Sequence, residues 1–180
     1  MSESLQKKYS KDVIPALRKH FGYTNVMAVP RITKIVLNVG TSQALKDPKY
    51  LETIEGTLTR ITGQKPATRT AKKSIAAFKI REGQVIGKMV TLRGKRMYDF
   101  LEKVIHIALP RLRDFRGLEE KSLDGSGNLT IGFPEYTVFP EIRPDEIERL
   151  HGLQATFVTN AKTREEALEL LKLFGFPFKR

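Results

Sequence analysis

The chain has no cysteine and only three histidines among its 180 residues. Without a thiol it can form neither a disulfide nor a thiolate metal site, which fits a reducing compartment. The histidines, His20, His106 and His151, are far apart in the sequence and show none of the paired spacings of metal ligands. Each is better explained as a surface or packed residue than as a ligand, and no cofactor is expected.

Long apolar runs and catalytic motifs are missing as well. No apolar run approaches the roughly 20 residues that span a bilayer, and the opening MSESLQKKYSKD lacks the apolar core of a secretion signal. Neither a G-x-x-x-x-G-K-[ST] phosphate loop nor a G-x-S-x-G nucleophile motif occurs. The sequence therefore predicts a cytosolic protein that is not an enzyme and has no membrane partner.

Acidic residues are scarce in one part of the chain. The net charge is +12 and the pI about 10.0; residues 1–120 hold 24 basic and 11 acidic side chains, whereas residues 121–180 hold 8 and 9. Within residues 60–96 eleven Lys or Arg face a single acid, Glu82. Basic side chains neutralise phosphates, so this clustering favours a nucleic-acid partner over an ordinary solvated surface.

Hydrophobic periodicity predicts helices at residues 5–21, 48–62, 97–112 and 164–174. Pro15 should kink or divide the first of them because it removes a backbone hydrogen bond. Asp47 is placed to cap the second helix, ahead of a proline in its first turn. The last helix follows the capping box formed by Thr163 and Glu166.

Alternating or extended runs predict strands at residues 31–39, 66–70, 84–93 and 153–159, and a short apolar run occupies residues 129–133. In the first strand Thr33, Ile35, Leu37 and Val39 should face the core, whereas Ile32, Lys34, Val36 and Asn38 face away from it. The predicted strands 66–70 and 84–93 form a hairpin whose basic tip spans residues 72–83. We expect a single domain, residues 1–180, of the α+β class: a mostly antiparallel sheet with helices packed on one face, the other face open, and a protruding basic hairpin loop.

Four uncharged polar residues lie on or beside these strands: Asn38, Gln64, Thr68 and Thr91. Such donors and acceptors can read base edges and ribose 2′-hydroxyls, whereas lysine and arginine give affinity without sequence information. A solvated strand residue or a local cap would explain each of them equally well.

Ile75, Phe78 and Ile80 are interleaved with the basic residues of the tip. They could pack beneath the loop as a small core, insert into a membrane interface, or lie against nucleic acid. The segment is short and has no helical moment, which disfavours the membrane.

Four strings occur in order along nearly the whole chain: KIVLNVG (34–40), GQKPATRTAKKSIAAFKIREG (63–83), DFRGL (114–118) and FGFPF (174–178). In these strings the chain resembles the bacterial ribosomal protein L5 family of the large subunit. The resemblance implies an open sheet face that binds 5S rRNA in the central protuberance, and a hairpin tip that reaches toward the tRNA in the peptidyl site.

Carried onto this sequence, the resemblance implies two sets of contact residues. The rRNA-binding set is Lys34, Asn38, Gln64, Lys65, Thr68, Arg69, Thr91 and Arg93. The tRNA-binding set is Lys72, Lys73, Ser74, Ile75, Phe78, Lys79 and Arg81.

The resemblance also implies contacts with 23S rRNA, with neighbouring proteins of the central protuberance and, around residues 134–152, with a protein of the small-subunit head. The alternative is a free-standing RNA chaperone or regulator, and an enzyme is a distant third.

Overall fold

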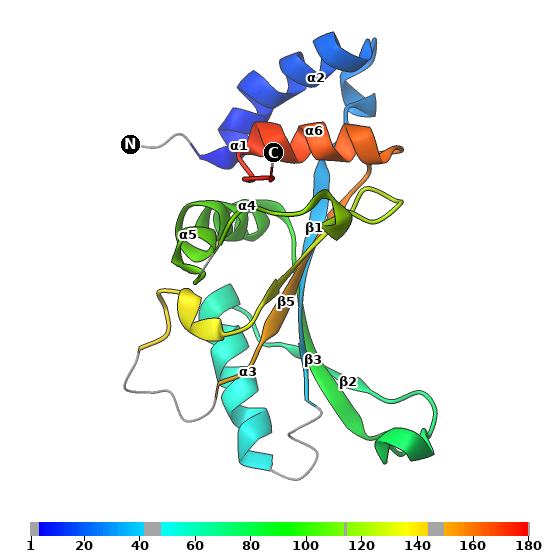
Figure 1. Ribbon diagram of the computed structural model, residues 1–180, viewed down its shortest axis with the longest axis vertical. Helices are drawn as coiled ribbons and strands as arrows, with labels where there is room; N and C mark the ends of the chain where they lie inside the picture. Colours follow the sequence, from blue (N-terminus) through cyan, green and yellow to red (C-terminus); the bar gives the residue numbers. More distant parts are fainter. Residues whose placement is uncertain (1–3, 42–47, 114, 144–149, 180) are drawn as a thin grey trace. The chain divides into compact units, whose positions relative to one another are not determined.

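The computed structural model describes residues 4–41, 48–113, 115–143 and 150–179 (Figure 1). Its strands are β1 (Ile32–Gly40), β2 (Ala67–Thr70), β3 (Val85–Leu92), β4 (Leu129–Phe133) and β5 (Leu153–Thr159). They form one five-stranded antiparallel sheet in the order β2-β3-β1-β5-β4. With the helices described below, this confirms the predicted α+β class and the four predicted strands, and β4 occupies the short apolar run at residues 129–133.

Besides short 3₁₀ turns, the described residues form four continuous helical stretches. Their segments are α1 (Leu5–Lys8), a π-helical turn (Tyr9–Val13) and α2 (Ile14–Phe21); α3 (Pro48–Thr62); α4 (Gly94–Lys103), a second π-helical turn (Val104–Ala108) and α5 (Leu109–Arg111); and α6 (Arg164–Phe174). The predicted helix at 97–112 therefore begins three residues earlier, at Gly94.

A proline is accommodated in two of these helices by a widened turn. The N–H of Ile14 donates to the carbonyl of Tyr9, five residues back, and Pro15 follows directly in the first turn of α2. The same π-helical turn precedes Pro110 in the first turn of α5. Because proline has no N–H and its ring crowds the preceding turn, the wider turn lets the helix continue. Pro15 changes the helix type without ending the helix.

The chain forms two compact units, each defined by the contacts among its own residues. Each unit contains segments of the strands. Unit 1 comprises residues 1–35, 92–131 and 156–180, and unit 2 comprises residues 36–91 and 132–155. The single domain expected from the sequence stays a prediction.

Unit 1 contains α6, whose predicted ends are confirmed. The hydroxyl of Thr163 accepts a hydrogen bond from the N–H of Glu166 at 3.2 Å, and Gly175 closes the helix with φ +104°. Ala167, Leu170 and Leu171 are buried on its inner side. The apolar stripe of α6 is thus fixed at both ends by the residues that the sequence supplies.

Unit 2 is built around α3 and the adjoining parts of the strands (Figure 1). Ile54, Leu58 and Ile61 of α3 are buried, as are Leu37 and Val39 of β1. The helix ends before Gly63, which has φ +68°, as predicted. Asp47, the predicted cap, lies outside the described residues.

Strand β1 follows the predicted alternation only in part. Ile35, Leu37 and Val39 are buried while Asn38 is exposed, but the start of the strand reverses the prediction: Ile32 is buried and Thr33 is exposed. The hydroxyl of Thr33 donates to the carbonyl of Val158 on β5 at 3.1 Å, so the side chain stays at the surface and bonds the neighbouring strand.

Candidate nucleic-acid interface

The pairing of β2 with β3 decides which side chains share a face of the hairpin. Arg69 pairs with Gly87, and Thr68 pairs with Lys88. Directly paired residues of antiparallel strands point to the same face, and successive residues to opposite faces. Arg69 therefore lies on the face away from Lys88, and Thr68 lies on the face that carries Lys88.

Asn38 on β1 and Arg69 on β2 lie on either side of Gly87. A Cβ built on Gly87 would meet the Asn38 Oδ1 at 3.8 Å and the Arg69 Cβ at 3.9 Å. Both side chains are exposed, and neither has a hydrogen-bond or ion-pair partner among the described residues. We call this side of β1, β2 and β3 in unit 2 the open face.

The face that carries Lys88 turns toward α3. The Lys88 ammonium donates to the Glu55 carboxylate at 2.6 Å and to the Thr68 hydroxyl at 3.0 Å, and Lys65 approaches the same carboxylate at 3.5 Å. The hydrogen bond from Lys88 holds the pKa of Glu55 below its ordinary value. Lys88, counted among the basic residues of this segment, is therefore a buried structural cation that ties the hairpin to α3.

Gln64 and Thr91 meet through the main chain. The Gln64 Nε2 donates to the carbonyl of Thr91 at 2.7 Å, which fixes the turn after α3 against β3. Thr91 is half-buried. It lies four residues after Gly87 on β3, and therefore on the same side of the strand. Gln64 thus borders the open face with its side-chain amide already engaged.

Six of the eight predicted rRNA-binding residues belong to unit 2, and they divide into three groups. Asn38, Arg69 and Thr91 lie on the open face, and Gln64 borders it. On the other face, Lys65 contacts Glu55 and Thr68 contacts Lys88. The remaining two, Lys34 and Arg93, belong to unit 1, where Lys34 is half-buried on β1 and Arg93 is exposed just before α4.

The hairpin tip, residues 72–83, has a backbone frame of its own. Ile75 and Ile80 exchange two hydrogen bonds, at 2.9 and 3.1 Å, around a short 3₁₀ turn. The Ser74 hydroxyl accepts from the N–H of Glu82 at 2.9 Å. Lys79 has φ +54°, the single described non-glycine residue in the left-handed region. These bonds fold the backbone of the tip into a closed turn.

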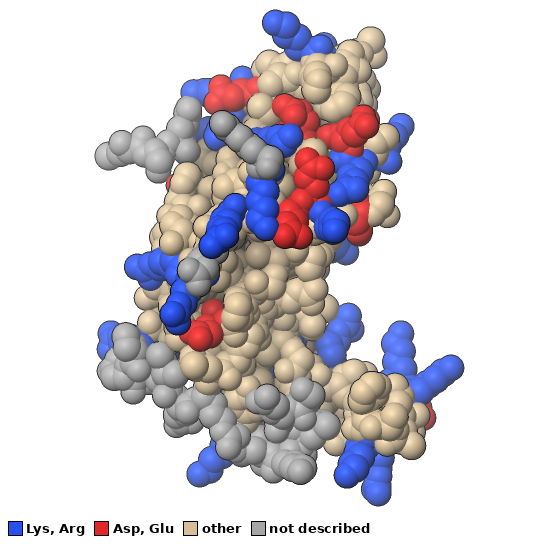
Figure 2. All heavy atoms as spheres, viewed as in Figure 1, with Lys and Arg blue, Asp and Glu red and all other residues tan. Residues whose placement is uncertain are grey.

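The tip exposes both cations and apolar side chains. Phe78 is 69% exposed and Ile75 46%, so these two side chains do not form the small core considered beneath the loop, whereas Ile80 is half-buried. The surrounding cations are Lys72, Lys73, Lys79 and Arg81; all are exposed, and none has an ion-pair partner among the described residues. Figure 2 shows basic side chains extending from the hairpin tip in several directions. An aromatic ring among unpaired cations suits stacking against nucleic acid.

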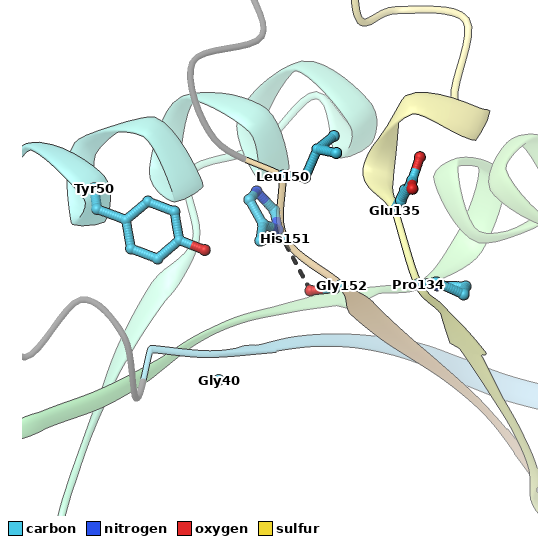
Figure 3. A pocket seen from close by; sticks show the side chains of 7 residues that line it. All are labelled: Gly40, Tyr50, Pro134, Glu135, Leu150, His151 and Gly152. Carbon is cyan, nitrogen blue, oxygen red and sulfur yellow. Dashed lines mark hydrogen bonds between the residues drawn. The ribbon is translucent and has the colours of Figure 1, made fainter.

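A pocket of about 330 Å³ in unit 2 offers a different kind of site (Figure 3). His151, 6% exposed, stacks on Tyr136 with ring centroids 4.3 Å apart and meets Tyr50 edge-on. Its Nδ1 lies 3.3 Å from the Gly152 carbonyl, and its Nε2 has no hydrogen-bond partner in the described chain. Burial lowers the pKa of His151. Of the two roles predicted for each histidine, surface or packed, His151 thus has the packed one.

The other two histidines, His20 and His106, are exposed. In the described ranges no three His, Asp or Glu side chains gather closely enough to hold a metal ion. None of the helices described here is long and apolar enough to cross a bilayer.

Comparison with known proteins covers nearly the whole chain. The family model "Ribosomal protein L5" matches residues 25–81, and the model "ribosomal L5P family C-terminus" matches residues 85–178. The chain is 56% identical over 175 residues to the large ribosomal subunit protein uL5 of Heliobacterium modesticaldum, covering 97% of each chain. It is 54% identical over 179 residues to the uL5 protein of Cupriavidus metallidurans, covering 99% of each.

These matches confirm the resemblance seen in the four sequence strings. They also confirm the predicted location in the ribosome and the absence of an enzymatic role. The chain therefore belongs to the ribosomal protein L5 family and is a structural constituent of the large ribosomal subunit.

Proposed function

We propose that this chain binds 5S rRNA through the open face of unit 2 and contacts the tRNA in the peptidyl site through the hairpin tip. The observation that carries the first part is the pair Asn38 and Arg69, which are exposed side by side across Gly87 without a partner among the described residues. An amide can bond a base edge or a 2′-hydroxyl, and a guanidinium can bond a phosphate.

The residues proposed for 5S rRNA have unequal roles. Asn38 and Thr91 contact bases or sugars, and Arg69 contacts a phosphate. Gln64 acts mainly by holding the Thr91 backbone, since its Nε2 donates there. Lys65 and Thr68 support the hairpin through Glu55 and Lys88. Lys34 and Arg93 remain proposed contacts from unit 1.

The experiment for the open face compares 5S rRNA binding by Asn38→Ala, Thr91→Ala and a control, Thr130→Ala, on β4. Loss of one well-made polar contact should weaken binding by about 1 to 3 kcal/mol, or about 5- to 150-fold. Thr130, which is half-buried and bonds Thr156 in unit 1, should bind like the wild type. Wild-type affinity in both Asn38→Ala and Thr91→Ala would refute this use of the open face.

The tip is proposed to meet tRNA through Lys72, Lys73, Ser74, Ile75, Phe78, Lys79 and Arg81. Because Ala71 and Gln84 are already hydrogen-bonded at 2.9 Å, residues 72–83 can be replaced by a two-residue Asn-Gly turn. Ribosomes carrying this variant should keep 5S rRNA and lose affinity for tRNA in the peptidyl site. Loss of 5S rRNA instead would show that the two contacts are not separate.

Further proposed partners are 23S rRNA, neighbouring proteins of the central protuberance and a protein of the small-subunit head. The head contact is assigned to residues 134–152, of which 144–149 lie outside the described residues. Leu150 is 51% exposed beside exposed Glu135 and Pro134, a surface that suits a protein partner. Cross-linking from Glu135 to a small-subunit protein in intact ribosomes tests this assignment.

A further inference from the structure

Gly87 is a glycine that its own backbone does not require. Its φ lies outside the left-handed region, unlike seven other glycines of the chain, so any L-residue could adopt this conformation. The tightest contact of a Cβ there would be with the Val39 carbonyl, and the Asn38 and Arg69 side chains lie beside it at ordinary contact distance.

A β-bulge adjoins this glycine. Arg69 pairs with Gly87 but Thr70 pairs with Val85, which leaves Ile86 as an extra residue on β3. Thr41 bonds the bulge from the other side, its N–H donating to the Ile86 carbonyl at 3.0 Å. Bulges of this kind often redirect side chains next to functional sites, and here the bulged residue is bonded on the side of Thr41.

Asn38, Gly87 and Arg69 thus form one row across three neighbouring strands. Asn38 offers an amide and Arg69 a guanidinium, while Gly87, buried between them, has only main-chain atoms. A sugar needs close approach and a partner for its 2′-hydroxyl, while the adjoining phosphate needs a cation. This inference rests on the 5S rRNA function proposed above. We infer that one ribose and its phosphate bind over Gly87, between Asn38 and Arg69, in a site that we call the seat. The missing side chain of Gly87 is therefore part of RNA recognition.

Packing within the sheet is the competing reason for a glycine here. A Cβ at Gly87 would come within 3.1 Å of the Val39 carbonyl, closer than ordinary van der Waals contact. An experiment must show whether a side chain at Gly87 blocks RNA or displaces the neighbouring strand β1. A substitution at Gly40 is the matched control. Gly40 is an exposed glycine of the same unit, and a Cβ there meets nothing within 4 Å.

Gly87→Ala and Gly40→Ala are compared for 5S rRNA affinity over a salt series and for their melting temperatures. The seat predicts at least a tenfold loss for Gly87→Ala at every salt concentration. Because a blocked seat also displaces the phosphate beside Arg69, the slope of log affinity against log salt should become shallower by about one phosphate contact. Gly40→Ala should bind within twofold of wild type. Wild-type binding by Gly87→Ala, or equal losses in both variants, would overturn the inference.

A measurement on the wild-type chain decides the case in which Gly87→Ala folds poorly. In cross-saturation from 5S rRNA to the deuterated, ¹⁵N-labelled protein, the Gly87 amide should lose signal, whereas the amide of Gly56 on α3 should not. An unaffected Gly87 beside an affected Asn38 would overturn the seat and leave the proposed function standing. If Asn38→Ala also binds normally and neither amide responds, the proposed function itself fails.

Discussion

The Lys88 ammonium lies 2.6 Å from the Glu55 carboxylate, and this ion pair joins β3 to α3 beneath the open face. Lys88 is buried, so its charge depends on Glu55 and on the Thr68 hydroxyl for solvation. The pair fixes the base of the hairpin whose other face is proposed to meet RNA.

Glu55→Gln should therefore destabilise the protein by about 1.5 to 3 kcal/mol, because it leaves Lys88 without its charged partner. Since the pKa of Glu55 is lowered in the folded state, the contribution is present at neutral pH and is lost as the pH falls through that lowered pKa. Urea unfolding at pH 7 measures the change. Glu52→Gln, on the exposed side of the same helix, should stay within 0.5 kcal/mol; equal effects would contradict the assignment.

Gly127 tests packing in unit 1. It has φ +76°, and a Cβ there would lie 2.8 Å from the Ala167 Cβ of α6. Gly127→Ala should lower stability by about 1 to 3 kcal/mol through backbone strain and overpacking. Gly125→Ala, in the same loop with nothing within 4 Å of its Cβ, is the control and should be nearly neutral. Thermal unfolding distinguishes the two variants, and an unchanged midpoint for Gly127→Ala would be at odds with this packing.

His151 should make stability depend on pH. Burial lowers its pKa, so the unfolded chain binds the proton more readily than the folded chain. Stability therefore falls as the pH drops below about 6.5, where the unfolded histidine becomes charged. Unfolding free energies between pH 7.5 and 5.5 should show a shallower pH dependence for His151→Phe than for wild type. His106→Gln, at an exposed site, should retain the wild-type dependence; a parallel curve for His151→Phe would count against this role.

Lys79 tests the hairpin tip. Its left-handed backbone costs a side-chain residue about 1 to 2 kcal/mol. Lys79→Gly should therefore leave the amide protection of Ile75 and Ile80 unchanged or raise it, whereas Lys79→Val should lower it, and hydrogen exchange reads both. Both variants remove the same charge, so a loss of tRNA affinity that they share belongs to the charge. An equal loss of amide protection in the two variants would contradict the strain argument.

Sequence patterns predicted those helices and strands whose ends depend only on residues a few positions away. Strand β5 occupies the predicted residues 153–159, and α6 is capped by Thr163 and ended by Gly175 as expected. These features depend on neighbours a few positions away, so the sequence displays them directly.

The sequence could not predict roles that depend on distant partners. Lys88 reads as one more basic residue until its pairing with Glu55, 33 positions away, is known. Thr68 is placed beside Lys88 by strand pairing, and Gly87 becomes notable only once Asn38 and Arg69 lie beside it. A sign was present at Gly87, since an isolated glycine inside a strand suggests a bulge or a close backbone approach.

The most direct test of specific 5S rRNA recognition measures binding of the purified protein to 5S rRNA and to a tRNA-sized control RNA across a salt series. Specific recognition predicts tighter 5S rRNA binding at every salt concentration, with the two curves separating as salt rises and the shared phosphate contribution weakens. Curves that coincide and fall together would contradict it, because charge alone would then explain the binding.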